Sequence, residues 1–584
     1  MDHYPYRPVK QYLQAREYSG WQLIKSYWQS DQRIIAYMFA IVIMIMTVIL
    51  VGFDVVFNYW YNYFYNALQE YNVHAAVRLL VVFFILAAFY IVLQVYRYYI
   101  SQLFGLRWRR WLTEQLIDRW LQKRGYYYLE NFDVKTDNPD QRIQEDANTL
   151  ISNSIDLTVG LVAAITTFPA FIYILWTLSG VLTIPLGPLG SLHIHGYLVW
   201  AGLLYNLIGT LITFKIGRPL VPLNFEQQRR EATFRYSAID LRSHAEQVAL
   251  YQGEHHQKAI LDSHFSKVLE NWYAIILRQK LLLWFTGGFN QAAVLLPLIV
   301  ALPNYFGKVF LLGGLMQSIR AFSSVQDSLS YLVNAYTQIA QWRAISQRLT
   351  TFINHVYDAE VTAENTNKIV VNKQPENIIS TKNVTINTAR GELLLLNIDE
   401  TFIHGNNYVI KGESGIGKST FIRTLAGIWP YASGEITFPA NKRVMYLPQI
   451  SYMPIGTLAG AMVFPDKTDP GLEKQLKQVL HDCHLDIFIP RLNEIAAWSE
   501  QLSPGEQQRI GFARVLLHKP DWVFLDESTS MLDLNNEAHL YKLLRERLPN
   551  CSVVSVGHHP SIDVFHEHVV TMEKYKIQPQ ISTA

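Results

Sequence analysis

The sequence predicts two domains of different classes, a helical domain of about six membrane spans followed by an α/β domain. Its 584 residues exceed the length of a domain with a single hydrophobic core, so at least two domains are expected. Hydrophobic residues make up 50% of the chain, which is too apolar for an ordinary soluble enzyme and too polar for a chain lying wholly within a membrane. Long apolar runs occupy only the N-terminal part, and short strand-like runs alternate with helical patterns after them.

Six apolar runs are long enough to cross a bilayer, which takes about 20 residues of helix. They cover 34–56, 76–103, 155–180, 194–217, 281–306 and 309–333. The last run carries Arg320 and Asp327, which are costly in lipid, so we expect them to face a protein or water-filled interior.

Lysine and arginine gather in alternate connections between these runs. The segments 1–33, 104–154 and 218–280 are rich in them, whereas 58–72 and 181–192 have none. The positive-inside rule therefore predicts that both termini are cytoplasmic and that 181–192 is external. We expect four parts: an N-terminal interfacial segment at 1–33, a transmembrane domain at 34–357, a polar linker at 358–377 and a second domain at 378–584. The interfacial segment has an alternative, a helix packed on the protein.

A glycine-rich turn follows the strand pattern at 407–411 and precedes a helical pattern. Its sequence, Gly412-Glu-Ser-Gly-Ile-Gly-Lys-Ser419, fits the phosphate loop G-x-x-x-x-G-K-S/T. Backbone N–H groups can close on phosphates there, Lys418 can neutralise their charge, and Ser419 can offer a hydroxyl to Mg²⁺. We therefore expect ATP and Mg²⁺ at Gly412, Glu413, Ser414, Gly415, Ile416, Gly417, Lys418, Ser419 and Thr420.

Two adjacent acids end the apolar strand pattern at 521–525. Asp526 can hold Mg²⁺ through water, and Glu527 can orient or deprotonate an attacking water. The alternative is an acidic surface turn. The position of the two acids directly after an apolar strand, downstream of a phosphate loop, disfavours that alternative. Together the two motifs predict nucleotide hydrolysis.

The segment from Leu502 to Arg509, Leu-Ser-Pro-Gly-Glu-Gln-Gln-Arg, resembles the ABC signature, usually written LSGGQ. Pro504 replaces its first glycine, and Glu506 stands where the motif has glutamine. Other ABC motifs accompany it in the expected order. Gln449 resembles the Q-loop glutamine, Asp533 belongs to a segment like the D-loop, and His558 resembles the switch histidine.

This resemblance begins near residue 378 and implies an ATP-binding-cassette domain. It implies a catalytic set of Glu527, His558 and Gln449, nucleotide contacts from Ser503, Gly505 and Asp533, and Mg²⁺ contacts from Ser419, Gln449 and Asp526. One position departs from the family. Thr388 stands where many ABC domains carry an aromatic ring that stacks on adenine, so adenine stacking is left open.

The membrane part also resembles a known group. The segments that carry this likeness to subfamily D ABC transporters begin at Leu106, Asn138, Gly217, Phe234 and Ala245. That subfamily includes fatty-acyl-CoA carriers, a cobalamin transporter and bacterial relatives. The run 313–317, with Phe322 and Trp342, looks closest to bacterial BacA/SbmA-like peptide importers, which lack an ATPase domain. The resemblance implies an exporter-type ABC fold and a bacterial inner-membrane protein.

In the ABC family, ATP lies between the phosphate loop of one domain and the signature of another. A chain with one of each therefore implies a homodimer. The function implied is ATP-driven transport of a medium to large solute, namely a peptide, a cobalamin-like compound or a long-chain acyl compound, with import favoured. The partners are a second copy, the bilayer and the solute. The net charge of +2 argues against nucleic acid. The alternatives are a nucleotide-gated channel or regulator, and a proton-coupled peptide carrier with a regulatory ATPase domain.

Overall fold

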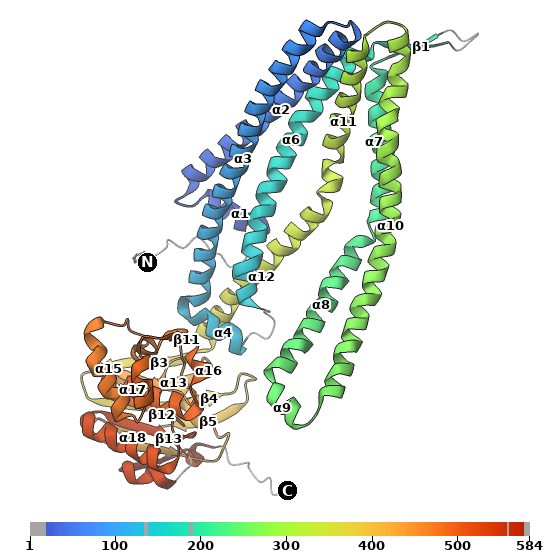
Figure 1. The fold of residues 1–584 in the computed structure, drawn as a ribbon. Coiled ribbons are helices and arrows are strands. Elements are labelled where there is room, and N and C mark those ends of the chain that lie inside the picture. The colour runs from blue at the N-terminus through green and yellow to red at the C-terminus, as the bar shows by residue number, and fades with distance from the viewer. Residues whose placement is uncertain (1–18, 133–137, 186–190, 558–559, 577–584) are drawn as a thin grey trace. The chain divides into compact units, whose positions relative to one another are not determined.

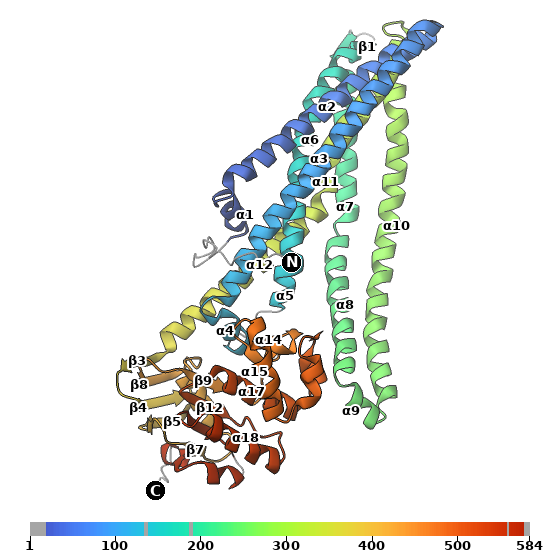
Figure 2. The same ribbon diagram turned by 60° about the vertical axis from the view of Figure 1, so that its left-hand side comes forward.

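The computed structural model describes residues 19–132, 138–185, 191–557 and 560–576 (Figures 1 and 2). These form two units. The first comprises Met1–Tyr126 and Lys135–Val356 and is mainly helical. The second comprises Tyr127–Val134 and Tyr357–Ala584 and contains sheets covered by helices. The two fold classes that the sequence predicts are therefore both present.

The first unit is built from long helices. They are α1 (Gly20–Trp28), α2 (Arg33–Gln69), α3 (Val73–Leu121), α6 (Ala147–Ser179), α7 (Tyr197–Gly217), α8 (Leu220–Ser243), α9 (Ala245–Leu250), α10 (Glu254–Phe306), α11 (Leu312–Asn334) and α12 (Tyr336–Thr366), with the short α5 (Pro139–Gln141) before α6. The last residues of α12 and most of the short α4 (Gly125–Phe132) belong to the second unit. Several are much longer than a span. The 53 residues of α10 extend about 80 Å at about 1.5 Å per residue, against a hydrocarbon core of about 30 Å.

Five helical stretches of the described chain are long and apolar enough to cross a membrane: Arg33–Gln69, Val73–Asn131, Pro139–Ser179, Tyr197–Ser243 and Glu254–Phe306. Each covers all or most of one of the first five expected runs; the fourth run, 194–217, begins in strand β2 (Ser191–His195) and enters its helix only at Tyr197. The connection expected at 58–72 is shorter than predicted, because α2 continues to Gln69.

The sixth expected run forms α11, which packs against α2, α6, α7 and α10. Its lower apolarity has a structural reason. Gln317 is 2% exposed; its backbone carbonyl accepts from Asn58 at 3.1 Å and its side-chain oxygen accepts from Asn62 at 2.5 Å. The guanidinium carbon of Arg320 lies 4.1 Å from the centroid of the Tyr61 ring. Gln317 and Arg320 therefore contact α2, as expected for polar groups kept away from lipid.

The helix α1 packs on its own unit. Leu23 and Tyr27 are fully buried, and the ring of Tyr27 stacks on Trp108 of α3 with centroids 5.1 Å apart. Trp21, on another face of α1, is 69% exposed. Helix α1 thus packs on the protein, while its position at a membrane surface stays a prediction. Residues 1–18 lie outside the described part.

The connection at 181–192 forms part of a β-hairpin. Strand β1 (Val181–Pro185) pairs antiparallel with β2 (Ser191–His195).

The second unit contains a parallel sheet in the order β14-β7-β13-β12-β9. Its strands are β7 (Tyr408–Lys411), β9 (Val444–Leu447), β12 (Trp522–Asp526), β13 (Ser552–Val556) and β14 (His568–Thr571). The central strands are apolar runs buried on both faces, as parallel sheets require. Helices accompany the sheet: α13 (Lys418–Leu425), α14 (Leu458–Val463), α15 (Glu473–Asp482), α16 (Trp498–Gln501), α17 (Pro504–His518) and α18 (Leu534–Arg547).

A second sheet, mostly antiparallel, has the order β3-β8-β4-β5, with β6 also paired to β4. Its strands are β3 (Lys368–Gln374), β4 (Ile378–Asn387), β5 (Leu393–Ile398), β6 (Thr401–Ile403) and β8 (Ala432–Pro439). A two-stranded pair, β10 (Gly456–Thr457) and β11 (Ile495–Ala496), completes the unit's strands in the described residues.

The segment 358–377 differs from the expected linker. Helix α12 continues to Thr366, and Lys368–Gln374 forms the edge strand β3, which pairs parallel with β8. Most side chains of β3 are exposed, as is common for an edge strand. Its polar composition therefore resembles that of a linker, although its backbone is part of a sheet.

Candidate functional site

The phosphate loop connects β7 to α13, as the sequence predicts. Gly417 is the N-cap residue of α13 and has φ of +111°, in the left-handed region. A Cβ at Gly417 would lie 2.7 Å from Cδ2 of Leu394, so a side chain has no room there. No side chain caps α13, which leaves its first N–H groups available to phosphate oxygens.

Lys418 lies folded over this loop and is 5% exposed. Its Nζ donates to the carbonyl oxygens of Gly412 at 2.8 Å and Glu413 at 2.9 Å. Burial lowers the pKa of the ammonium, while the charges of Glu527, Glu573 and Asp526 raise it. The ammonium therefore lies among carbonyls and carboxylates that bound phosphate can replace as its partners.

Oxygen ligands for a cation meet where β12 ends. The hydroxyl of Ser419 donates to Oδ1 of Asp526 at 2.7 Å, although 107 positions separate the two residues. Burial raises the pKa of Asp526, and the hydrogen bond from Ser419 opposes that shift. A hydroxyl and a partly buried carboxylate side by side suit Mg²⁺, which prefers oxygen ligands and relieves the burial of negative charge.

Glu527 follows at the end of the same strand, and its backbone has φ of +48°. Non-glycine residues held in this region store strain, which is common at functional positions. Its N–H donates to the carbonyl of Val556, and its Oε2 accepts from Nε2 of Gln449 at 3.2 Å. The proposed base and the Q-loop glutamine are thus in direct contact.

The signature begins α17, with Ser503 as its N-cap. The Ser503 hydroxyl donates to Oε2 of Glu506 at 2.7 Å, and the same carboxylate oxygen accepts from the N–H of Ser503 at 2.8 Å. Glu506 in place of the usual glutamine therefore completes a capping box. A Cβ at Gly505 would lie 3.0 Å from the carbonyl oxygen of Met531, so this glycine permits close approach to the D-loop.

Gln508 is a residue to which the sequence analysis assigned no role. Its side chain is 2% exposed. Its Nε2 donates to the carbonyl of Gln449 at 3.1 Å and to the hydroxyl of Ser530 at 3.3 Å, and its Oε1 accepts from the N–H of Met531 at 3.0 Å. One amide thereby joins the Q-loop, the signature helix and the D-loop. Its position within the signature segment could have indicated a functional role from the sequence.

The remaining predicted residues lie as follows. Asp533 is the N-cap of α18 and accepts from the N–H of Asn536 at 2.9 Å, which helps to lower its pKa. Thr388 forms a turn in which its hydroxyl accepts from the N–H of Glu392 at 3.2 Å. His558 lies outside the described residues, two positions after the end of β13.

Comparison with known proteins identifies the family of both units. The family described as "ABC transporter transmembrane region 2" matches residues 23–306, and "ABC transporter" matches 395–530. The inner membrane ABC transporter ATP-binding protein YddA of Escherichia coli is 32% identical over 92% of this chain and 94% of its own. The chloroplastic ABC transporter D family member 2 of Arabidopsis thaliana is 29% identical over 84% of this chain and 75% of its own.

The fold also has a solved counterpart. The structure of a bacterial Atm1-family ABC exporter with ATP bound has a TM-score of 0.70 and 17% identity, covering 94% of this chain and 95% of that one. The likeness to an exporter-type ABC fold is therefore shown in three dimensions. The chain belongs to the ABC transporter family, as a helical transmembrane domain fused to an ATP-binding domain whose ATPase activity is coupled to transport.

Proposed function

We propose that the chain is a homodimeric half-transporter that imports a medium to large solute across a bacterial inner membrane. The solute classes proposed are peptides, cobalamin-like compounds and long-chain acyl compounds. Two observations support the proposal. Ser419 of the phosphate loop lies against Asp526, and Glu527 lies against Gln449. The chain has one phosphate loop and one signature.

The cluster assigns a task to each residue. Glu527 orients the attacking water and accepts its proton, and Gln449 holds the Glu527 carboxylate. Lys418 exchanges its loop carbonyls for phosphate oxygens. Ser419, Asp526 and the amide oxygen of Gln449 would hold Mg²⁺, which neutralises phosphate charge during transfer.

The homodimer follows from the count of motifs. One phosphate loop and one signature cannot enclose an ATP in the manner of the family, so the second copy supplies the other half. Ser503 and Gly505 are proposed to donate hydrogen bonds to the ATP held by that copy. In the single chain the Ser503 hydroxyl donates to Glu506, and ATP from the partner would replace this acceptor.

The membrane placement rests on charge. Both termini are proposed to be cytoplasmic and the hairpin at 181–192 external, because lysine and arginine avoid 58–72 and 181–192. The inner membrane is proposed from the bacterial resemblance and from the relative YddA, and import from the likeness of 313–317 to peptide importers.

Reconstitution in proteoliposomes tests the proposal. Peptides, a corrinoid and a long-chain acyl compound are offered with and without ATP, to wild type and to Glu527→Gln. ATP-dependent movement of one class toward the side of the ATPase domain is expected, with loss in the variant. Ion currents without solute movement would contradict transport, as would uptake that persists in Glu527→Gln and collapses with an uncoupler.

A further inference from the structure

The first unit contains a cavity of about 400 Å³, away from the residues assigned to ATP. It lies among α1, α2, α3, α6 and α12. Its wall is largely aromatic and aliphatic, and includes Trp21, Trp28, Ile43, Trp108, Thr158 and Trp342.

The hydroxyl groups in this wall already have partners. The hydroxyls of Thr47, Ser154 and Thr158 each donate to a carbonyl one turn earlier in their own helix, at 2.7, 2.6 and 2.7 Å. The indole N–H of Trp342 donates to the Ser154 hydroxyl at 2.8 Å. These four groups therefore have no unused donor, and the rest of the wall is mostly aliphatic and aromatic, so the cavity suits an apolar occupant, namely hydrocarbon.

The wall is held in place by packing. The short helix α1 presents Trp21, Ile24 and Trp28 to the cavity, at the spacing of one helical face. Its next face buries Leu23 and Tyr27, and the stacking of Tyr27 on Trp108 fixes α1 to α3. Packing therefore holds α1 as one wall of a cavity that stays open on one side, where Trp21 is exposed.

The surroundings indicate where the hydrocarbon comes from. The most apolar stretches of α2, α3 and α6 are only 28%, 6% and 11% buried within this chain, and their length and composition suit contact with lipid. Tryptophan is enriched at the level of lipid headgroups. Two exposed cations adjoin the cavity wall along the chain, Lys25 after Ile24 and Arg107 before Trp108, and basic groups at this level attract anionic headgroups.

We propose that the cavity binds one acyl chain of a resident membrane phospholipid, with the lipid phosphate beside Lys25 and Arg107. The lipid is part of the folded membrane unit and is distinct from the transported solute. Its acyl chain fills the space between α1 and the spans and thereby supports the position of α1.

A photoreactive side chain tests the proposal in the full-length protein. Benzoylphenylalanine replaces Thr158, which lines the cavity, or Ile165, which is 63% exposed on the same helix. The protein is washed extensively in detergent, illuminated and weighed by mass spectrometry. A phospholipid adduct is expected several times more often at 158 than at 165, because washing removes freely exchanging lipid. Equal adducts at both positions, or none at 158, would overturn the proposal.

Occupants of the cavity other than a resident lipid would give different cross-linking results at position 158. Joining of two chains through position 158 would show that a second copy covers the cavity, and would overturn the proposal. Loss of the adduct during ATP turnover would identify the occupant as cargo, with the same consequence, whereas a constant yield supports a resident lipid. These outcomes leave the ATPase assignment untouched.

A filled cavity provides an independent check. Met44→Trp introduces a larger ring into the wall, and Ile45→Trp places the same ring at the neighbouring position, which is 53% exposed. With benzoylphenylalanine at 158, the lipid adduct should fall in Met44→Trp and remain in Ile45→Trp. If Met44→Trp does not fold, the comparison of positions 158 and 165 still decides. An equal yield in both folded variants would count against the site.

Discussion

At the scale of single residues, different side chains of the proposed ATP site serve nucleotide binding and hydrolysis. Lys418 carries the positive charge over the phosphate loop, and Glu527 carries the negative charge that faces Gln449. The two side chains come from separate motifs, and of the two only Lys418 is expected to contribute to nucleotide affinity.

Replacing these two residues should therefore give different defects. Lys418→Ala should weaken nucleotide binding, because phosphate loses its main cation. Glu527→Gln should retain binding and slow hydrolysis by about 10²–10⁴, the usual contribution of a positioned base. Binding of a fluorescent ATP analogue and phosphate release measure the two effects. An equal loss of binding in both variants would show that the roles are wrong.

A second residue-scale prediction concerns Glu573, which contacts the phosphate loop from the C-terminal side. Its Oε1 accepts from the N–H of Glu413 at 2.9 Å, and the preceding Met572 is fully buried. Glu573→Ala should remove this bond and weaken ATP binding about fivefold, for a net loss of about 1 kcal/mol. Glu573→Gln retains an amide oxygen as acceptor and is the matched control. Equal affinities in Glu573→Ala and wild type would exclude a positioning role.

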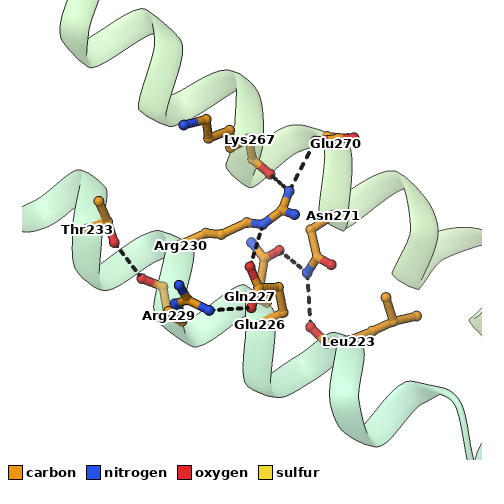
Figure 3. Close-up of polar contacts among 9 residues, drawn as sticks. All are labelled: Leu223, Glu226, Gln227, Arg229, Arg230, Thr233, Lys267, Glu270 and Asn271. Atoms are coloured by element: carbon orange, nitrogen blue, oxygen red, sulfur yellow. Dashed lines mark hydrogen bonds and ion pairs between the residues drawn. The ribbon is translucent and has the colours of Figure 1, made fainter.

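At the scale of elements, α8 and α10 lie side by side and are joined by a polar network (Figures 1 and 3). Asn271, 5% exposed, donates from Nδ2 to the carbonyl of Leu223 and to Oε1 of Gln227, both at 2.9 Å. Arg230 donates to the carbonyl of Lys267 at 2.5 Å and to Glu270 at 3.2 Å. The network makes the pair one rigid element that carries α9 at its end.

Asn271→Leu should loosen this element. It leaves the Leu223 carbonyl and the Gln227 side chain without their donor in a buried place, at a cost of about 1–3 kcal/mol. Hydrogen exchange measured by mass spectrometry should become faster in 220–243 and 254–280. Arg229→Ala removes an exposed ion pair from α8 and is the control, with exchange near wild type. Unchanged exchange in Asn271→Leu would mean that apolar packing alone holds the pair.

At the scale of the whole molecule, the shared ATP site makes a prediction about mixed dimers. In a dimer of one Lys418→Ala chain and one Ser503→Arg chain, both lesions fall in the same composite site and the other site stays intact. Each homodimer has no intact site. Mixing should therefore restore part of the ATPase activity, provided that one site can cycle alone.

Cross-linking tests the shared site without requiring that one site can cycle alone. Cysteines at Ser414 and Ser503 should form a disulfide only between chains and only with ATP, in a background that lacks Cys483 and Cys551. A cross-link that forms with ATP within one monomeric chain would overturn the proposed dimer, whatever the ATPase result.

Local patterns predicted the elements because their causes are local. An apolar run of sufficient length specifies a spanning helix, and a glycine turn between a strand and a helix specifies a phosphate loop. The strand β3 was missed because its cause is not local. Its side chains are mostly exposed, and only pairing with β8 makes it a strand.

The sequence by itself determined the family, the two fold classes and the residues of the phosphate loop, since each depends on neighbours along the chain. Only the tertiary structure decided which distant groups meet. It placed Ser419 against Asp526, gave Gln508 its three partners, paired Gln317 with Asn58 and Asn62, and left a cavity behind α1. These contacts depend on packing between segments up to 259 positions apart. The residue pattern of one segment does not indicate which side chains of the other segment it will contact.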